Sequence, residues 1–389
     1  MVKQTNIPGQ IWRKGIGLMF GVAAVVAIWR VWPRERLLTA VATPIVQVAV
    51  GREEICWLSS HECLLVTADH EPGYPGVRDP SDGLAHWEGT VDLLDISTHT
   101  RRPLEALTAL FKREMAVPLT VPENLHASSG GQWIRWDTHA ARGTMFMGRV
   151  VRLDGTHYRH WDLAPNGIIE FQQTDFFLDA GHLVCMSPRQ PIMTVLDLQD
   201  PTRDIKYSKL TDTQEVLTQY ARQHPVFHHG EREGEDAITI TEYRTQDRMQ
   251  EVLANGGQMR AAPQPLQKLT RKLPKDATIV ACKLSLQQNT VYHLDCSRTS
   301  TLLTWLHRLL PTFTSTPKHT EELWVSRAEG GGMHEIGHVP IPTDATGQTV
   351  SPPDGLESFL DDIQWLPDGK HVSFVYRGML YVVPAEPAK

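Results

Sequence analysis

Beyond Pro44, short apolar runs alternate with turn residues, and few segments have a helical period. Runs of roughly four to eight residues that are rich in β-branched and aromatic side chains are typical of strands. The pattern predicts strands at residues 45–50, 91–96, 149–153, 194–198, 237–243, 291–294, 323–326, 372–376 and 379–383. We therefore expect an all-β domain over residues 45–389.

Two stretches depart from this pattern. Asp212-Thr213-Gln214-Glu215 resembles a capping box that leads into residues 216–222, so a short helix is expected there. The charged run HHGEREGEDA, residues 228–237, is interpreted as a solvated connecting loop, with metal binding by its two histidines as the alternative.

A longer apolar segment precedes the strands. Residues 15–29 carry no charge, and tryptophans at 12, 29 and 32 bracket the run as aromatic side chains do at membrane interfaces. This predicts a transmembrane signal-anchor helix at 15–33, between a short tail at 1–14 and a linker at 34–44. Ala40-Val41-Ala42 is an alternative cleavage site, but three arginines separate it from the apolar run. The short tail favours a single-pass protein with its body outside the cytoplasm.

Two turn patterns recur along the chain. In the first, LDGTHYR (153–159), ANGGQMR (254–260) and AEGGGMH (328–334) each place an acidic or amide residue before glycine and end on a basic residue. In the second, a turn joins two apolar runs at 55–66, 177–184 and 363–374, the last with Pro-Asp-Gly. Both patterns are typical of β-hairpins.

The segments IQWLPDGKHVSFVYRGMLYVVPA and LWVSRAEGGGMHEIGHV resemble the repeats of TolB-type β-propellers, which are related to the propellers of the prolyl oligopeptidase family. The likeness is strong over 322–384, moderate over 53–66 and 145–161, and faint over 205–280. It implies a β-propeller that serves as a protein-interaction hub at the cell envelope. No partner-binding residue carries over to this chain.

The recurring turns lie at steps close to the ~40–50 residues of a four-stranded blade. This predicts six or seven blades, with an irregular or inserted region at about 205–280. The last predicted blade lacks an outer strand, and residues 45–50 are expected to supply it and close the ring.

Composition narrows the function. The 389 residues carry a net charge of −7, so no basic surface for nucleic acid is indicated. The five cysteines, Cys56, Cys63, Cys185, Cys282 and Cys296, are interpreted as buried apolar residues. Disulfides between Cys56 and Cys63 or between Cys282 and Cys296 remain the alternative.

The segment His334-Glu335-Ile336-Gly337-His338 matches the H-E-x-x-H pattern of zinc metallopeptidases. Two such histidines share a face on a helix, whereas on a strand they lie about 13 Å apart along the chain. Three glycines precede the segment and prolines follow it, so a strand is predicted and metal binding by His334, Glu335 and His338 is the disfavoured alternative. His334 aligns with Arg159 and Arg260, which indicates a solvent-facing basic position.

Other catalytic patterns are missing from the sequence, including G-x-S-x-G, the P-loop and a dinucleotide fingerprint. His293 with Asp295, and His157 with Asp154, are interpreted as ordinary strand and turn residues. Tryptophans 57, 133, 136, 324 and 365 are assigned to the core. No catalytic residue and no cofactor is therefore predicted.

These observations favour a membrane-anchored, extracytoplasmic propeller that binds a protein, peptide or glycan partner and is not an enzyme. A propeller hydrolase or lyase with its site at the channel mouth is the alternative, because such sites assemble from distant loops.

Overall fold

The computed structural model describes residues 36–48, 53–67, 89–114, 123–139, 146–163, 175–186, 193–223, 226–233, 237–247, 250, 267–272, 277–284, 289–298, 318–327, 333–342, 350 and 358–386. The chain divides into two compact units, Met1–Leu37 and Leu38–Lys389, and the elements below belong to the second. The predicted anchor at 15–33 lies outside the described residues. Within them, every helix is too short or too polar to cross a bilayer.

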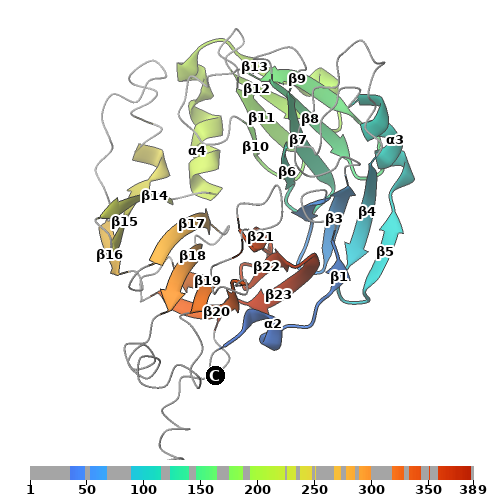
Figure 1. Cartoon of the computed structure of the whole chain (residues 1–389). Helices are drawn as coiled ribbons and strands as arrows, with labels where there is room; N and C mark the ends of the chain where they lie inside the picture. The colour runs from blue at the N-terminus through green and yellow to red at the C-terminus, as the bar shows by residue number, and fades with distance from the viewer. Residues whose placement is uncertain are drawn as a thin grey trace, which may run out of the picture. The chain divides into compact units, whose positions relative to one another are not determined.

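The described strands form six antiparallel sheets in chain order (Figure 1). The first sheet contains β2 (Glu53–Trp57), β3 (Glu62–Thr67), β4 (Thr90–Asp95) and β5 (Thr100–Pro103). The second contains β6 (Glu123–Ala127), β7 (Trp133–His139), β8 (Phe146–Arg152) and β9 (Arg159–Leu163). The third contains β10 (Asp175–Phe177), β11 (His182–Met186), β12 (Met193–Asp197) and β13 (Ile205–Tyr207).

The fourth sheet has three described strands, β14 (Val226–Glu233), β15 (Ala237–Arg244) and β16 (Gln267–Lys272). The fifth contains β17 (Ala277–Leu284), β18 (Thr290–Arg298), β19 (Lys318–Ser326) and β20 (His334–Pro340). The sixth joins β21 (Leu360–Trp365), β22 (His371–Tyr376) and β23 (Met379–Pro384) to β1 (Val46–Gln47). Short helices are α2 (Leu38–Val41), η2 (Pro201–Arg203), η3 (Leu210–Thr213), α3 (Glu105–Glu114) and α4 (Gln214–Gln223).

The pairing of β1 with β23 confirms the predicted closure by residues near 45–50. Val46 lies opposite Leu380 in the ladder, and the Ile45 amide donates to the Leu380 carbonyl at 2.9 Å. The first sheet also bonds directly to the sixth, since Trp57 Nε1 donates to Ser373 Oγ at 2.9 Å. Residues more than three hundred positions apart thus share one seam.

Apolar clusters join neighbouring sheets face to face. Sheets one and two share a core that includes Leu64 and Trp136, and sheets two and three share one that includes Trp133 and Leu183. Sheets five and six pack through a third cluster, and sheets six and one through a fourth. Consecutive four-stranded antiparallel sheets whose first and last members pack together form a β-propeller.

Eight of the nine predicted strands and the predicted helix are confirmed, the helix as α4, and the strand predicted at 45–50 is confirmed over Val46–Gln47, with residues 49–50 outside the described residues. The loop assigned to residues 228–237 is wrong, because residues 228–233 belong to β14, which pairs with β15 from Val226↔Arg244 to Glu233↔Ala237. A ladder of this length satisfies the backbone even where charged side chains stand on the strand. Helix α3, which buries Leu107, Leu110 and Phe111 at helical spacing, was not predicted.

The two ends of the strands differ in how they are connected. At one end, named here the short-turn end, lie the turns 58–61, 96–99, 128–132, 153–158, 178–181, 198–204 and 366–370. In four sheets an amide at the later turn donates to a carbonyl at the earlier one: Ile96 to His61, Leu153 to Gln132, Leu198 to Gly181 and Ala385 to Lys370. Among the described residues, the opposite end carries helix α3, which follows β5, and the turn 377–378 between β22 and β23.

Side-chain oxygens fix the turns of the short-turn end, as the hairpin patterns predict. Asp95 Oδ1 accepts from the Ser97 amide at 2.8 Å and from the Ser97 hydroxyl, and these hydrogen bonds lower the pKa of Asp95 to about 2. Asp368 accepts from the amides of Lys370 and His371 in the Pro-Asp-Gly turn. The turns 58–61, 178–181 and 366–370 occupy equivalent places in sheets one, three and six, which confirms that the second recurring pattern is a repeat.

Leu380→Ala is expected to lower the free energy of unfolding by ~2–5 kcal/mol, because the fully buried side chain packs at the seam between sheets six and one. Urea unfolding of the full chain, followed by tryptophan fluorescence, measures this. Ile205→Ala, at a side chain that is 52% exposed, is the control and should change stability by no more than ~0.5 kcal/mol. Equal effects of the two substitutions would contradict the assigned seam.

Candidate functional site

The His334–His338 segment forms β20, which confirms the predicted strand. The ladder with β19 places Val325 opposite His334, Trp324 opposite Glu335 and Glu322 opposite His338. A bulge interrupts this register at Gly337, whose φ of +152° favours glycine. The bulge reverses the alternation, so His334 shares the face of Val325 while His338 shares the opposite face with Glu335 and Glu322.

The two imidazoles consequently have different partners. His338 is 1% exposed, and its Nδ1 lies 2.8 Å from Glu335 Oε1. His334 Nε2 instead donates to the Ala385 carbonyl at 2.9 Å, at the end of β23. Within the described residues, histidine, cysteine and acidic side chains form no group of three placed to hold a metal ion. The geometry therefore gives His334 and His338 separate roles in packing the sheets.

The solvent-facing position assigned to His334 and Arg159 is wrong. Both side chains are partly buried, and each donates to a carbonyl at the end of the third strand of the next sheet. For Arg159 this acceptor is Asp197, at 3.0 Å from Nη1. The alignment of these two hairpins is confirmed, since the repeated basic residue links one sheet to the following one. Arg260, the third aligned position, lies outside the described residues.

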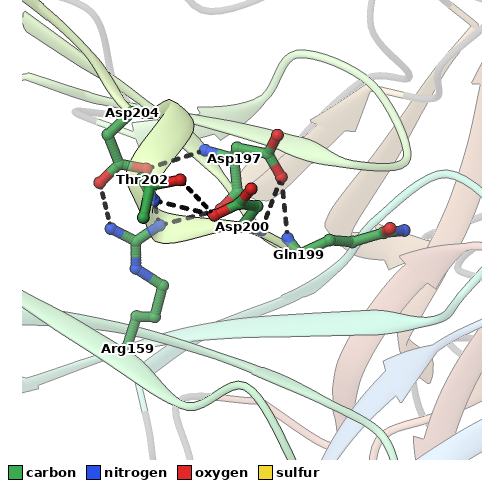
Figure 2. Close-up of polar contacts among 6 residues, drawn as sticks. All are labelled: Arg159, Asp197, Gln199, Asp200, Thr202 and Asp204. Carbon is green, nitrogen blue, oxygen red and sulfur yellow. Dashed lines mark hydrogen bonds and ion pairs between the residues drawn. The ribbon is translucent and has the colours of Figure 1, made fainter.

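Figure 2 shows the link made by Arg159, which extends from β9 toward the loop between β12 and β13. Its two Nη atoms bind the two carboxylate oxygens of Asp204, with 2.9 Å from Nη1 to Oδ1. The Asp197 amide donates to the same Oδ1 at 3.1 Å. A bidentate pair of this kind fixes the orientation of both groups, so it sets how sheets two and three meet.

The loop that carries Asp204 is itself held by capped turns (Figure 2). Asp197 Oδ1 accepts from the amides of Gln199 and Asp200, both at 3.0 Å, and Asp200 Oδ1 accepts from the Thr202 amide and hydroxyl. These hydrogen bonds lower the pKa of Asp197 and of Asp200, in the second case chiefly through the Thr202 hydroxyl. Both carboxylates therefore stay ionised while they shape the loop.

Glu321 makes the corresponding link between sheets five and six. The carboxylate, on a residue 3% exposed, accepts from the amides of Phe359 at 2.8 Å and Leu360 at 2.7 Å, where β21 begins. His293 Nε2, on β18, lies 3.0 Å from Glu321 Oε2. A buried carboxylate bonded to two backbone amides and an imidazole is stabilised in place and anchors the incoming strand.

Asp295 lies opposite Glu321 in the ladder, so the two carboxylates share a face. Burial raises the pKa of Asp295, the charge of Glu321 raises it further, and His319 and His293 act in the opposite direction. His293 is therefore bonded to Glu321 and not to Asp295, although His293 and Asp295 are only two positions apart in the sequence. The linking role of Glu321 was not predicted from the sequence. The local sequence shows only a charged residue inside a strand, which does not indicate its partners.

The remaining candidate residues have structural environments. Asp154 Oδ1 accepts from the Thr156 amide at 2.9 Å and caps its turn, while the ring of His157 lies edge-on to Trp133. Trp57, Trp133 and Trp136 are buried, as predicted, and Trp324 and Trp365 are partly buried.

Four cysteines, Cys56, Cys63, Cys185 and Cys296, are buried free thiols, and the side chain of Cys282 lies outside the description. Cys56 and Cys63 lie in different apolar cores. Cys56 packs in the core shared with sheet two, and Cys63 packs in the core shared with sheet six. Burial raises the pKa of the Cys56 and Cys63 thiols well above the usual value. Inert buried thiols match the sequence interpretation for these four residues.

The polar groups between sheets form one set, named here the junction links. Besides Arg159–Asp204, Glu321 and His334, the set includes Glu54 Oε1, which accepts from the Leu125 amide at 3.2 Å between sheets one and two. Gln364 Nε2 donates to the Ile55 carbonyl at 2.7 Å between sheets six and one. Each link is directed at the backbone or an opposite charge of a neighbouring sheet.

A double-mutant cycle on Arg159→Ala and Asp204→Ala should give a coupling energy of ~1–3 kcal/mol in urea unfolding, because the pair is bidentate and largely buried. The exposed pair Arg152–Asp154, with 3.5 Å between Nε and Oδ2, is the matched control and should couple by no more than ~0.5 kcal/mol. A coupling for Arg159–Asp204 as small as the control would show that it does not hold sheets two and three together.

Glu321→Ala should destabilise the chain by ~3–5 kcal/mol, because it leaves two backbone amides and the imidazole of His293 without their buried acceptor. Urea unfolding measures the loss, and Glu62→Ala, at an exposed strand position, serves as the control. A loss below ~1 kcal/mol would be inconsistent with an anchoring role for Glu321.

No protein-family model matches the chain, and no curated protein matches it. Solved structures similar to it include the β-propeller domain of Cps50 (Swd1) from Myceliophteria thermophila, at 10% identity and a TM-score of 0.33, covering 88% of this chain and 99% of that one. The β-propeller domain of the Trilobed protease from Pyrococcus furiosus has 7% identity and a TM-score of 0.20, covering 86% and 70%. TolB from Acinetobacter baumannii has 10% identity and a TM-score of 0.25, covering 86% and 55%.

This chain therefore spans about half the length of that TolB. At these TM-scores the propeller assignment depends on the sheets, their packing and the closing strand described above.

Proposed function

We propose that this chain is a membrane-anchored, extracytoplasmic β-propeller that acts as a binding scaffold for a protein, peptide or glycan partner at the cell envelope. The observation that supports this most directly is that the junction links bond neighbouring sheets to each other. Glu54, Arg159, Asp204, Glu321 and His334 are each bonded to a neighbouring sheet. Groups held in this way stiffen a ring, and a rigid ring with variable connections at one end suits recognition.

The TolB-like repeats at 322–384 support the same role at the level of a family resemblance. The apolar segment at 15–33, with its flanking tryptophans, supports anchorage. The hydrolase or lyase alternative has no comparable support, since Glu321 accepts from the backbone amides at the start of β21 and His293 is bonded to Glu321.

Fractionation of native membranes tests the anchor. The full chain should stay in the pellet after alkaline carbonate extraction, and deletion of residues 15–33 should release it to the supernatant. Protease added to intact cells or spheroplasts should degrade the propeller if it lies outside the cytoplasm. Release of the full chain by carbonate, or protection of the propeller from protease, would refute this part of the proposal.

Cross-linking on native membranes tests binding. A photoreactive side chain at Lys112, exposed on α3, should give a defined adduct that an excess of purified wild-type chain competes away. The same group at Lys206, exposed on β13, is the control position. A defined adduct at neither position, in membranes where the chain is folded and anchored, would contradict a scaffold role.

A further inference from the structure

The junction of sheets five and six holds two carboxylates that face each other across a ladder. Asp295 on β18 lies opposite Glu321 on β19, and these two residues are named here the carboxylate pair. Residues directly opposite in an antiparallel ladder have Cβ atoms about 4.5–5.5 Å apart, and their side chains project from the same face of the sheet. That face is turned toward sheet six, because Glu321 bonds to the start of β21.

The two carboxylates differ in their hydrogen bonds. Glu321 accepts from the amides of Phe359 and Leu360, and His293 Nε2 lies 3.0 Å from its Oε2. Asp295 is only partly buried, but its Oδ1 is enclosed and has no hydrogen-bond partner among the described residues. An enclosed acceptor without a donor is unfavourable, and a negative charge makes it more so. Asp295 is therefore the less stable ion of the pair.

The described charges of sheet five that act on Asp295, besides Glu321, belong to two imidazoles. His293 lies on the same face of β18, and His319 lies on the same face of β19. Thr278 of β17 and Val339 of β20 are the ladder neighbours of the pair on its two outer sides, and neither is charged. Within these strands, the repulsion in the pair is therefore offset only when an imidazole is protonated.

On the side of sheet six, the described titratable group that senses the pair is Tyr376. Burial raises the pKa of this phenol and the charge of Glu321 adds to the increase, while Arg377, which lies over the ring, acts in the opposite direction. The carboxylates of β21, Asp361 and Asp362, lie toward sheet one, since the ladder neighbour of the first packs in the core shared with sheet one and the second acts on buried thiols there. A phenol with a raised pKa stays neutral at neutral pH, so the charge balance of this junction is set within sheet five.

The surroundings of Asp295 favour its protonated form. Burial raises the pKa of Asp295, and the charge of Glu321 raises it further, while His319 and His293 act in the opposite direction. Because this pKa is higher in the folded chain than in the unfolded chain, the folded chain binds the proton more tightly. The resulting stabilisation is complete at low pH, and it is lost as the pH rises from the usual value of an aspartate through the raised value.

We propose that the proton on Asp295 controls how firmly Glu321 holds the start of β21, so that sheets five and six are joined more tightly in acid than at neutral pH. With Asp295 neutral, no like charge opposes Glu321 across the ladder, and the carboxyl group gains an O–H donor beside it. With Asp295 ionised, repulsion weakens the hydrogen bonds from the Phe359 and Leu360 amides. Sheet six carries β1, so the same proton affects the closure of the ring. This control depends on neither the proposed anchor nor the proposed partner.

Asp295→Asn in the full chain tests the proposal, because asparagine has nearly the same shape and stays neutral at every pH. Urea unfolding of both chains is measured from pH 4 to pH 8. The folding equilibrium constant of Asp295→Asn, divided by that of the unmodified chain, should increase about threefold over this range, as for the removal of one of two like charges that face each other in a ladder. Histidines that titrate in both chains cancel in this ratio.

Asp154→Asn is the control, because the hydrogen bonds from Thr156 lower the pKa of Asp154 and so reverse the sign of the effect. The same ratio for this variant should not increase with pH. A ratio for Asp295→Asn that stays constant or falls between pH 4 and pH 8 would overturn the proposal, since a purely structural effect of the amide does not vary with pH.

Amide hydrogen exchange measures the junction itself. In the unmodified chain, the protection of the peptide that covers Phe359 and Leu360, corrected for intrinsic exchange rates, should be about threefold greater at pH 4 than at pH 8. In Asp295→Asn the two values should be equal, and β3 in sheet one gives the reference for changes in overall stability. Equal protection of this peptide at the two pH values in the unmodified chain would overturn the proposal, whether or not the variant folds.

Discussion

The pairing of β1 with β23 is the interaction on which the rest of this fold depends. A ring of antiparallel sheets is held closed when its first and last segments share one sheet, and here Val46 and Leu380 share one ladder. An open edge would present a row of free amides and carbonyls to any extended chain. Trp57 and Ser373, joined across the same seam, add a buried hydrogen bond that only the closed ring can make.

Closure explains why the polar residues between the sheets are arranged as they are. The apolar faces supply most of the stabilising free energy, but burial is non-directional and tolerates sliding. The links made by Arg159 and Glu321 are directional, because a guanidinium fork or a carboxylate with two amide donors has one favourable geometry. The junction links therefore set the angle at which neighbouring sheets meet, and a ring closes only when those angles add up correctly.

The repeated basic position shows this at the level of sequence. Arg159 and His334 differ in chemistry, yet each donates to the carbonyl at the end of the third strand of the following sheet. Their hairpins share an acidic residue, glycine and a basic residue, which is why the repeat was recognisable. The two hairpins therefore make the same kind of link to the following sheet. The link from Arg159 also includes an ion pair with Asp204, whereas the link from His334 is the hydrogen bond alone.

Local patterns allowed the strands, the hairpins and α4 to be predicted, since alternation and turn chemistry act over a few residues. The long-range features were beyond reach for physical reasons. The face on which His338 lies depends on a bulge at Gly337, and the position of that bulge is set by pairing with β19. The two backbone amides that donate to Glu321 lie 38 and 39 residues away, at Phe359 and Leu360. Strand β14 was misjudged because its ladder with β15 outweighs its polar composition.

The same bulge decides how the zinc-peptidase pattern is interpreted. On a regular strand His334 and His338 would lie on one face, separated only along its length. With the register shifted at Gly337, His334 faces the sixth sheet and His338 the opposite side, where Glu335 binds it. Both imidazoles are then bonded within the described sheets, His338 to Glu335 of its own strand and His334 to the end of β23.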